Sequence, residues 1–107
     1  MYTYPEEQLR HITRILKNRF PKRVLSVYAF GSRIRGEYHE WSDFDVLIIV
    51  RDKTPALETE IIGIIVDEEM KMGLSFAPVI KDIEAFEMEK KHHSPFYEAI
   101  MKEGIPL

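Results

Sequence analysis

The sequence predicts an α/β protein with a small mixed β-sheet packed against helices. Short apolar runs rich in β-branched and aromatic residues, typical of strands, are interspersed with longer segments whose apolar residues recur at helical spacing. The strand-like runs carry few polar residues, as expected for strands covered by helices. The 107 residues are 45% hydrophobic and 31% charged, which is the balance of a folded chain with one core. We therefore expect a single domain over residues 1–107.

The first half of the chain is expected to form one helix and two strands. Apolar residues at helical spacing, with a proline at the start and acids in the first turn, predict a helix over residues 5–20. The run VLSVYAF at 24–30 is β-branched, aromatic and too short for a helix, so it predicts a strand that ends before Gly31. The run FDVLIIV at 44–50 predicts the second strand.

The second half is expected to add one long helix, a third strand and two short helices. Thr54 is a candidate helix cap and Gly73 a candidate helix end, which predicts a helix between them. The run LSFAPVI at 74–80 predicts the third strand, and its Pro78 suits an edge position better than a central one. The two short helices are expected at residues 82–91 and 95–102.

Composition excludes several classes of function. The formal charge of −3 offers no global positive field to hold a long nucleic acid, although a small phosphorylated ligand needs only local donors and metal. The chain has no cysteine, which excludes disulfides, thiolate zinc sites and a cysteine nucleophile. Its apolar runs are far shorter than the roughly 20 residues of a membrane span. We expect a cytoplasmic protein without a membrane partner.

Two aspartates at the mouth of the second strand are the first candidate site. Residues two apart in a strand point to the same face, so Asp43 and Asp45 are expected to project together. Adjacent carboxylates repel unless a positive charge lies between them, and Mg²⁺ prefers one or two carboxylates completed by water and phosphate oxygens. The alternative is a pair of surface acids, solvated or paired with Arg33 or Arg35.

A Gly-Ser pair after the first strand is the second candidate site. Gly31 permits a tight bend and a close backbone approach, and Ser32 offers a hydroxyl and an amide to a phosphate. If a helical turn opens at Ser32, its free N–H groups form an anion site. A plain turn with Ser32 as a helix cap is the alternative. An anion cradle after one strand, combined with a metal-binding pair on the next, favours a bound phosphorylated ligand.

The segment GSRIRGEYHEWSDFDVLI resembles the signature of the DNA polymerase β-like nucleotidyltransferase superfamily, in which Gly-Ser is followed after ten residues by Asp-x-Asp. Here ten residues separate Ser32 from Asp43. Chain length, the helix before the first strand and the ending SPFYEAIMKEGIPL are also similar to minimal nucleotidyltransferase domains. The resemblance implies a polymerase β-like fold for the whole chain.

The resemblance also implies a chemistry. In such enzymes the residues at Asp43 and Asp45 coordinate Mg²⁺ and are catalytic, while those at Gly31 and Ser32 bind the triphosphate. An acceptor hydroxyl attacks the α-phosphate and pyrophosphate leaves. The implied activity is transfer of AMP from ATP to a macromolecular acceptor, such as a HEPN toxin that a minimal nucleotidyltransferase antitoxin neutralises by adenylylating a tyrosine.

One departure from the family pattern concerns the third strand. Active members commonly carry a third acidic residue there, expected near Ser75 or Ala77, but LSFAPVI contains no carboxylate. A substitute acid, a site completed by a partner, and nucleotide binding with weak or no transfer are the three options. The competing function is therefore a nucleotide-binding antitoxin or regulatory module that acts by covering its partner. The oligomeric state is left open, with a homo-oligomer among the options.

Overall fold

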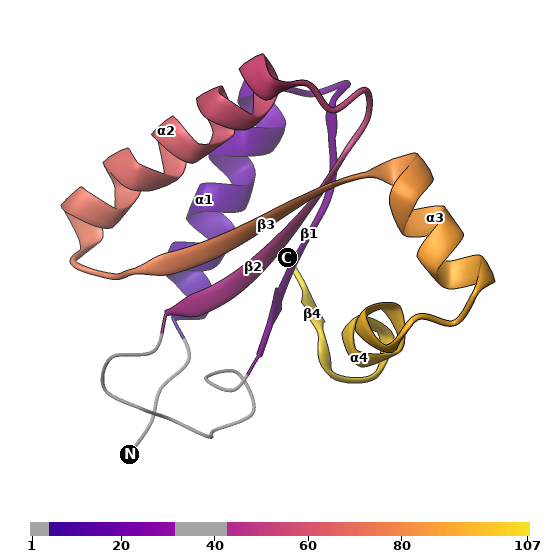
Figure 1. The fold of residues 1–107 in the computed structure, drawn as a ribbon. Helices are drawn as coiled ribbons and strands as arrows, with labels where there is room; N and C mark the ends of the chain where they lie inside the picture. The colour runs from indigo at the N-terminus through magenta and orange to yellow at the C-terminus, as the bar shows by residue number, and fades with distance from the viewer. Residues whose placement is uncertain (1–4, 32–42) are drawn as a thin grey trace.

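The computed structural model describes residues 5–31 and 43–107, and these form one mixed sheet with helices on both faces (Figure 1). The strand order is β3-β2-β1-β4. Strand β1 (Val24–Phe30) runs antiparallel to β2 (Phe44–Val50), which runs parallel to β3 (Phe76–Asp82). A two-residue strand, β4 (Ile105–Pro106), pairs antiparallel with β1. The predicted α/β class with a small mixed sheet is confirmed.

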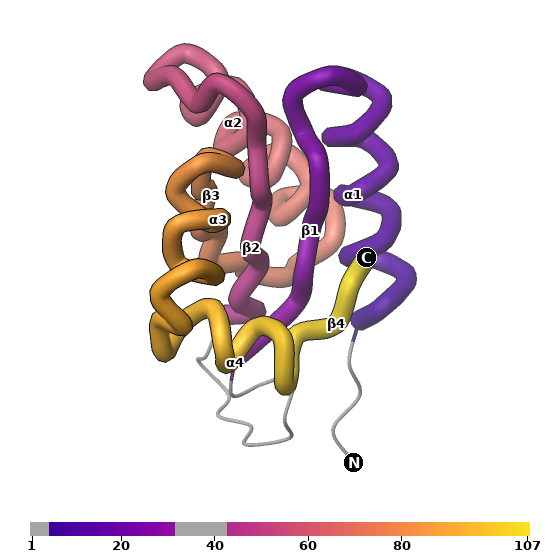
Figure 2. The backbone as a smooth tube through the Cα atoms, turned by 90° about the vertical axis from the view of Figure 1, so that its right-hand side faces the viewer, coloured from indigo at the N-terminus to yellow at the C-terminus, as the bar shows by residue number. Residues whose placement is uncertain are grey.

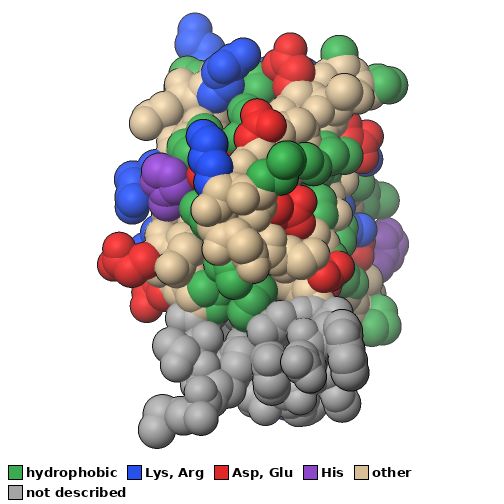
Figure 3. All heavy atoms as spheres, turned by 90° about the vertical axis from the view of Figure 1, so that its left-hand side faces the viewer, with side chains coloured by type: hydrophobic (Ala, Val, Ile, Leu, Met, Phe, Trp, Pro, Cys, Tyr) green, Lys and Arg blue, Asp and Glu red, His purple; other side chains and the backbone are tan. Residues whose placement is uncertain are grey.

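The helices divide between the two faces of the sheet (Figures 1 and 2). One face is covered by α1 (Glu6–Arg19) and α2 (Pro55–Met72), and the other by α3 (Ile83–Lys91) and α4 (Pro95–Glu103). Figure 3 shows the side on which α2 lies, where hydrophobic side chains reach the surface between carboxylates. Among the helices of residues 5–31 and 43–107, none is long and apolar enough to cross a membrane.

Alternation along β2 produces two separate cores. Every second residue, including Val46 and Ile48, packs with the buried faces of α1 and α2. The residues between them, Leu47 and Ile49, belong to a smaller cluster with Phe86 of α3 and Ile100 of α4. Because β2 is covered on both faces, it reads in the sequence as a continuous apolar run.

The helix ends follow from local sequence. The Thr54 hydroxyl accepts a hydrogen bond from the Leu57 amide at 3.1 Å, and Gly73 adopts a left-handed conformation with φ of 70° at the C-terminal end of α2. Both predicted ends of this helix are confirmed. The Ser94 hydroxyl accepts a hydrogen bond from the Tyr97 amide at 3.0 Å and so caps α4.

The sheet differs from the sequence prediction at its two edges. The third strand was expected at 74–80, but β3 spans Phe76–Asp82, because its hydrogen-bond register with β2 sets its extent. Strand β4 was not expected, since two residues carry no periodicity that marks a strand. Pro78 lies in edge strand β3, as predicted, and Pro106 lies in edge strand β4.

Candidate functional site

The end of β1 meets the start of β2 at Gly31 and Asp45. Phe30 pairs with Asp45 in the antiparallel register, which places the next residue, Gly31, beside the same aspartate. Gly31 has a φ of +94°, a conformation that residues with a β-carbon rarely adopt. A β-carbon at this position would overlap Oδ2 of Asp45. The glycine therefore serves both the turn and the close approach of the backbone to the carboxylate.

The two aspartates differ in exposure and influence each other electrostatically. Asp43 is exposed immediately before β2, whereas Asp45 is partly buried within the strand. Burial, and then the negative charge of Asp43, raises the pKa of the Asp45 carboxyl. A cation placed between these carboxylates would offset both costs. The effect of Asp43 on Asp45 is the one that two neighbouring carboxylates produce, and their role as metal ligands stays a prediction.

The acid pair lies on the sheet face that α3 and α4 cover. Asp45 is followed at alternating positions by Leu47 and Ile49, which belong to the core beneath these helices. Phe30, the register partner of Asp45, packs edge to face on Phe96 in the first turn of α4, with ring centroids 5.6 Å apart. The first turn of α4 therefore lies near the aspartates.

Strand β3 supplies no third carboxylate beside Asp45. Ala77 is the register partner of Asp45 in the parallel pair, and the Ser75 carbonyl accepts a hydrogen bond from the Phe44 amide at 3.0 Å. The nearest acid in sequence that contacts β3 is Glu69, whose Oε2 accepts a hydrogen bond from the Phe76 amide at 2.7 Å. Glu69 thus holds the start of the strand.

The donor set determines which metal the site could hold. In residues 5–31 and 43–107, no group of three or more His, Cys, Asp or Glu side chains is placed to hold a metal ion. Two carboxylates are nevertheless a suitable protein contribution for Mg²⁺, which takes its remaining ligands from water and phosphate oxygens. The residues fit a metal that arrives with a phosphorylated ligand.

Several candidate residues from the sequence lie outside the described residues. These are Ser32, the second half of the predicted phosphate cradle, and the two arginines that were the alternative partners of the acids, Arg33 and Arg35. The helical turn expected to open at Ser32 falls in the same segment. The roles given to these residues stay predictions.

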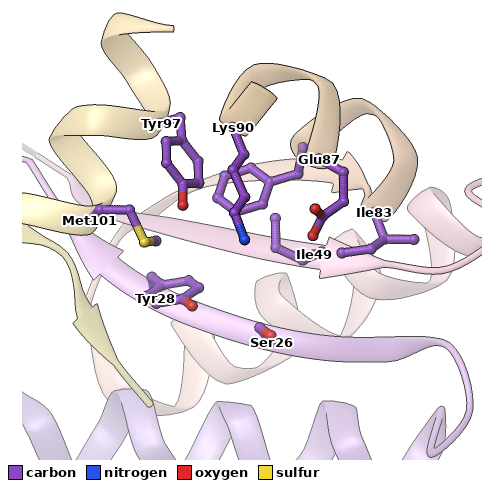
Figure 4. A pocket seen from close by; sticks show the side chains of 9 residues that line it. Ser26, Tyr28, Ile49, Ile83, Glu87, Lys90, Tyr97 and Met101 are labelled. Atoms are coloured by element: carbon purple, nitrogen blue, oxygen red, sulfur yellow. The ribbon is translucent and has the colours of Figure 1, made fainter. Parts of the chain in front are cut away.

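A hollow farther along the same sheet face was not predicted from the sequence. It has a volume of about 210 Å³ and lies between the sheet and the two helices (Figure 4). Ser26 and Tyr28 form part of its floor, while Lys90 and Tyr97 point toward the sheet from α3 and α4 (Figure 4). No motif marks it, because its lining comes from four separate elements. The spacing of Ser26 and Tyr28, which are two residues apart in one strand and therefore share a face, was the one available signal.

Two solved structures are similar to this protein in fold. The structure is similar to that described as "Crystal structure of a putative nucleotidyltransferase from Sulfolobus solfataricus at 1.40 A resolution", with a TM-score of 0.53, 21% identity, and coverage of 80% of this chain and 70% of that one. It is also similar to "Crystal structure of the toxin-antitoxin with AMP-PNP", with a TM-score of 0.58, 16% identity, and coverage of 96% and 72%. The fold is that of the nucleotidyltransferases.

Comparison of the sequence identifies the family. The family model of the nucleotidyltransferase domain matches residues 9–106, and the chain belongs to this family. It is 28% identical over 105 residues to "Putative protein adenylyltransferase MJ0604" of Methanocaldococcus jannaschii, covering 95% of this chain and 96% of the relative. It is 36% identical over 76 residues to "Putative protein adenylyltransferase MJ0141" of the same organism, covering 70% and 73%. The resemblance to nucleotidyltransferases is confirmed.

Proposed function

We propose that the protein is a Mg²⁺-dependent nucleotidyltransferase that transfers AMP from ATP to a hydroxyl of a macromolecular acceptor. The observation that carries the proposal is the contact between Gly31 and Asp45, which joins the two halves of the sequence motif in one place. Two relatives named as protein adenylyltransferases support the adenylyl group and a protein acceptor. The similar toxin-antitoxin structure with AMP-PNP supports a partner toxin, for which the sequence resemblance suggests the HEPN type.

The four candidate residues have distinct roles in this reaction. Asp43 and Asp45 would hold Mg²⁺, which would supply charge compensation for the triphosphate and for pyrophosphate as the leaving group. Gly31 lets the backbone approach the phosphates, because a side chain at this position would fill the space beside Asp45. Ser32 is proposed to complete the phosphate cradle with its hydroxyl and amide.

The reaction is a single displacement at the α-phosphorus. The acceptor oxygen forms a bond to this phosphorus, the bond to the bridging oxygen of pyrophosphate breaks, and the acceptor hydroxyl loses its proton. Because β3 has Ala77 beside Asp45 and places no carboxylate there, the proton of the acceptor hydroxyl passes to solvent water. The contribution of the protein is therefore positioning and charge compensation.

The acceptor is proposed to be a macromolecule. Residues 5–31 and 43–107 form a sheet with two helices on each face, and none of these elements stands apart to bind an acceptor. An acceptor protein supplies both the hydroxyl and the surface by which it binds to this domain. The acceptor would then be a tyrosine hydroxyl of the partner toxin, and the protein would act as an antitoxin.

A binding module is the second candidate function, and one observation favours it. The position opposite Asp45 on β3, where active relatives are expected to carry an acid, is Ala77. A protein with this deficit could bind nucleotide and neutralise its partner by covering it. The two candidates differ in whether the partner becomes covalently modified.

Transfer from labelled ATP distinguishes the two functions. The protein would be incubated with Mg²⁺ and the protein encoded beside it, with ATP labelled at the α-phosphate in one reaction and at the γ-phosphate in a parallel one. We expect label on the partner from the α-position alone. The double variant Asp43→Asn, Asp45→Asn should abolish labelling, while Glu7→Gln, which removes an exposed carboxylate on α1, should not change it.

Two results would count against transfer. Neutralisation of the partner without label, unchanged in the double variant, would assign the protein to the binding module. Calorimetric titration with Mg²⁺ and a nonhydrolysable ATP analogue tests the site separately. Each ligand should bind more tightly in the presence of the other. If neither binds, Asp43 and Asp45 are ordinary surface acids.

A further inference from the structure

The outward face of α2 carries an uncovered apolar stripe. Ile62, Val66 and Met70 follow one another at intervals of four residues, so they lie along one side of the helix. Their exposed fractions are 41%, 43% and 82%. The described residues contain five exposed large hydrophobic side chains, and three of them lie on this stripe. Such clustering on one helix face indicates a contact surface.

The stripe is not part of the core of this protein. The buried face of α2 consists of Leu57, Ile61 and Ile65, which pack in the large core with α1 and the sheet. A surface helix normally shows polar residues opposite such a face. In α2 the opposite side is apolar as well, which its own fold does not require.

Gly63 lies beside the stripe and leaves room over it. A β-carbon at this position would meet no atom within 4 Å, so the described residues do not require a glycine there. Glycine within a helix costs roughly 0.5–1 kcal/mol relative to alanine. The free space above Gly63 permits the backbone of another helix to approach closely.

Carboxylates border the stripe on both sides. By helical geometry Glu58 and Glu69 follow one edge, where Glu58 pairs with Lys53 and Glu69 accepts a hydrogen bond from the Phe76 amide. Glu60 and Asp67 follow the other edge, beside Lys71, which pairs with Glu68. Glu60 and Asp67 have no cationic partner within residues 5–31 and 43–107. The stripe itself has no charged residue. The surface thus combines an apolar centre with a negative rim.

We propose that this face of α2 binds an amphipathic helix of another protein whose apolar side is flanked by lysine or arginine. A basic flank would pair with Glu60 and Asp67, and the apolar side would cover the stripe. A second copy of this chain is disfavoured, because two α2 faces in contact would set one acidic rim against the other. The site is independent of the proposed transfer, since α2 lies on the opposite sheet face from Asp45.

Synthetic peptides test the proposal directly. The probe is a labelled amphipathic helix of about 21 residues, or six turns, with a leucine stripe flanked by lysines. One control has glutamates in place of the lysines, and another is a scrambled peptide with the same composition and no stripe. Fluorescence anisotropy should show that the lysine-flanked helix binds at least about 10-fold more tightly than either control. If the scrambled peptide binds equally tightly, the peptides are held by nonspecific charge attraction, and the proposal is overturned.

Variants of the protein locate the binding. Val66→Lys and Ile62→Gln should each lower the affinity for the lysine-flanked peptide about 10-fold or more, because they place a polar group in the contact. Met88→Lys is the matched control, since Met88 is 52% exposed on α3, away from the stripe. The double variant Glu60→Gln, Asp67→Asn should weaken binding several-fold at low salt and reduce its dependence on salt. Unchanged binding in all three stripe and rim variants would overturn the assignment.

Sedimentation equilibrium separates this partner from self-association. All variants are expected to sediment as the unaltered protein does and to unfold at a similar temperature, because the altered side chains are exposed. A dimer that Val66→Lys dissociates and Met88→Lys does not would assign the stripe to a second copy and contradict the proposal.

Discussion

Gly31 contacts the carboxylate of Asp45 so closely that a methyl group on its α-carbon would overlap Oδ2. The two residues belong to different strands, and they meet because Phe30 and Asp45 are partners in the antiparallel register. This contact connects Gly31 of the Gly-Ser motif with the acid pair.

Replacement of Gly31 by alanine should lower the stability of the folded protein. The β-carbon would overlap Asp45, and the φ of +94° is strained for any residue other than glycine. We expect a loss of roughly 1–3 kcal/mol in the free energy of unfolding, measured by urea denaturation. Gly63→Ala is the control, because its new β-carbon meets open space and should leave stability unchanged or slightly raised.

Replacement of Asp45 by asparagine should separate stability from activity. Because burial and Asp43 raise the pKa of Asp45, its ionised form costs free energy in the folded protein at neutral pH. In EDTA at pH 7 the Asp45→Asn variant should therefore unfold at a higher temperature than the unaltered protein. The proposed transfer of AMP should fall by at least about 100-fold, since a proposed metal ligand is lost. A lower unfolding temperature without metal would show that this carboxylate is structurally required.

An acid introduced at Ala77 should strengthen metal binding at the proposed site. Ala77 is the β3 partner of Asp45, so an aspartate there would point to the same sheet face. We expect the Ala77→Asp variant to bind Mg²⁺ several-fold more tightly in the presence of a nonhydrolysable ATP analogue, measured by calorimetry. Without metal its stability should fall by about 1 kcal/mol or more, because three carboxylates would repel.

The control for Ala77→Asp introduces an aspartate on the same sheet face but far from Asp45. Ser26 lies on the same face near the other end of β1, opposite Ile49. Ser26→Asp should leave the affinity for Mg²⁺ unaltered. Tighter metal binding in both variants would point to a general effect of charge on the surface.

The contact between Glu89 and Lys81 should make stability depend on acidity. The ammonium of Lys81, followed by the Ser94 hydroxyl at 2.8 Å, holds the pKa of the Glu89 carboxyl below its ordinary value of 4.5. Since the folded pKa is the lower one, the stabilisation is complete above the unfolded value and disappears as the pH falls through the folded value. Glu89→Gln should cost roughly 0.5–1 kcal/mol at pH 7.

Urea denaturation across a pH series measures this dependence. The stability difference between the unaltered protein and Glu89→Gln should be constant at neutral pH and shrink below pH 4.5. Glu7→Gln controls for the loss of a surface carboxylate at the same pH values. A Glu89→Gln difference that persists undiminished at about pH 3 would contradict the assigned contact.

Local patterns in the sequence predicted much of this fold. The strands at 24–30 and 44–50 have the predicted bounds, because a short apolar run between turn residues defines a strand by itself. Thr54 and Gly73 delimit α2 as expected, since capping depends on adjacent residues. The alternation of side chains in a strand predicted that Asp43 and Asp45 share a face, and the charge of Asp43 raises the pKa of Asp45.

Relations between distant segments were harder to predict. The partner of Asp45 on β3 depends on the register of a parallel pair, which α2 separates in the sequence, so both Ser75 and Ala77 were candidates. Ile105 and Pro106 form a strand only because β1 offers them hydrogen-bond partners. The hollow beside Lys90 and Tyr97 arises from packing among the sheet and two helices.

The prolines in the edge strands have a consequence for the protein at high concentration. Pro78 in β3 and Pro106 in β4 have no N–H group, so each interrupts the row of donors that an exposed edge offers to another chain. An apolar sheet of this kind is a template for fibrils if its edges stay open. The two rings reduce that hazard during synthesis and storage, and they do so without taking part in the site.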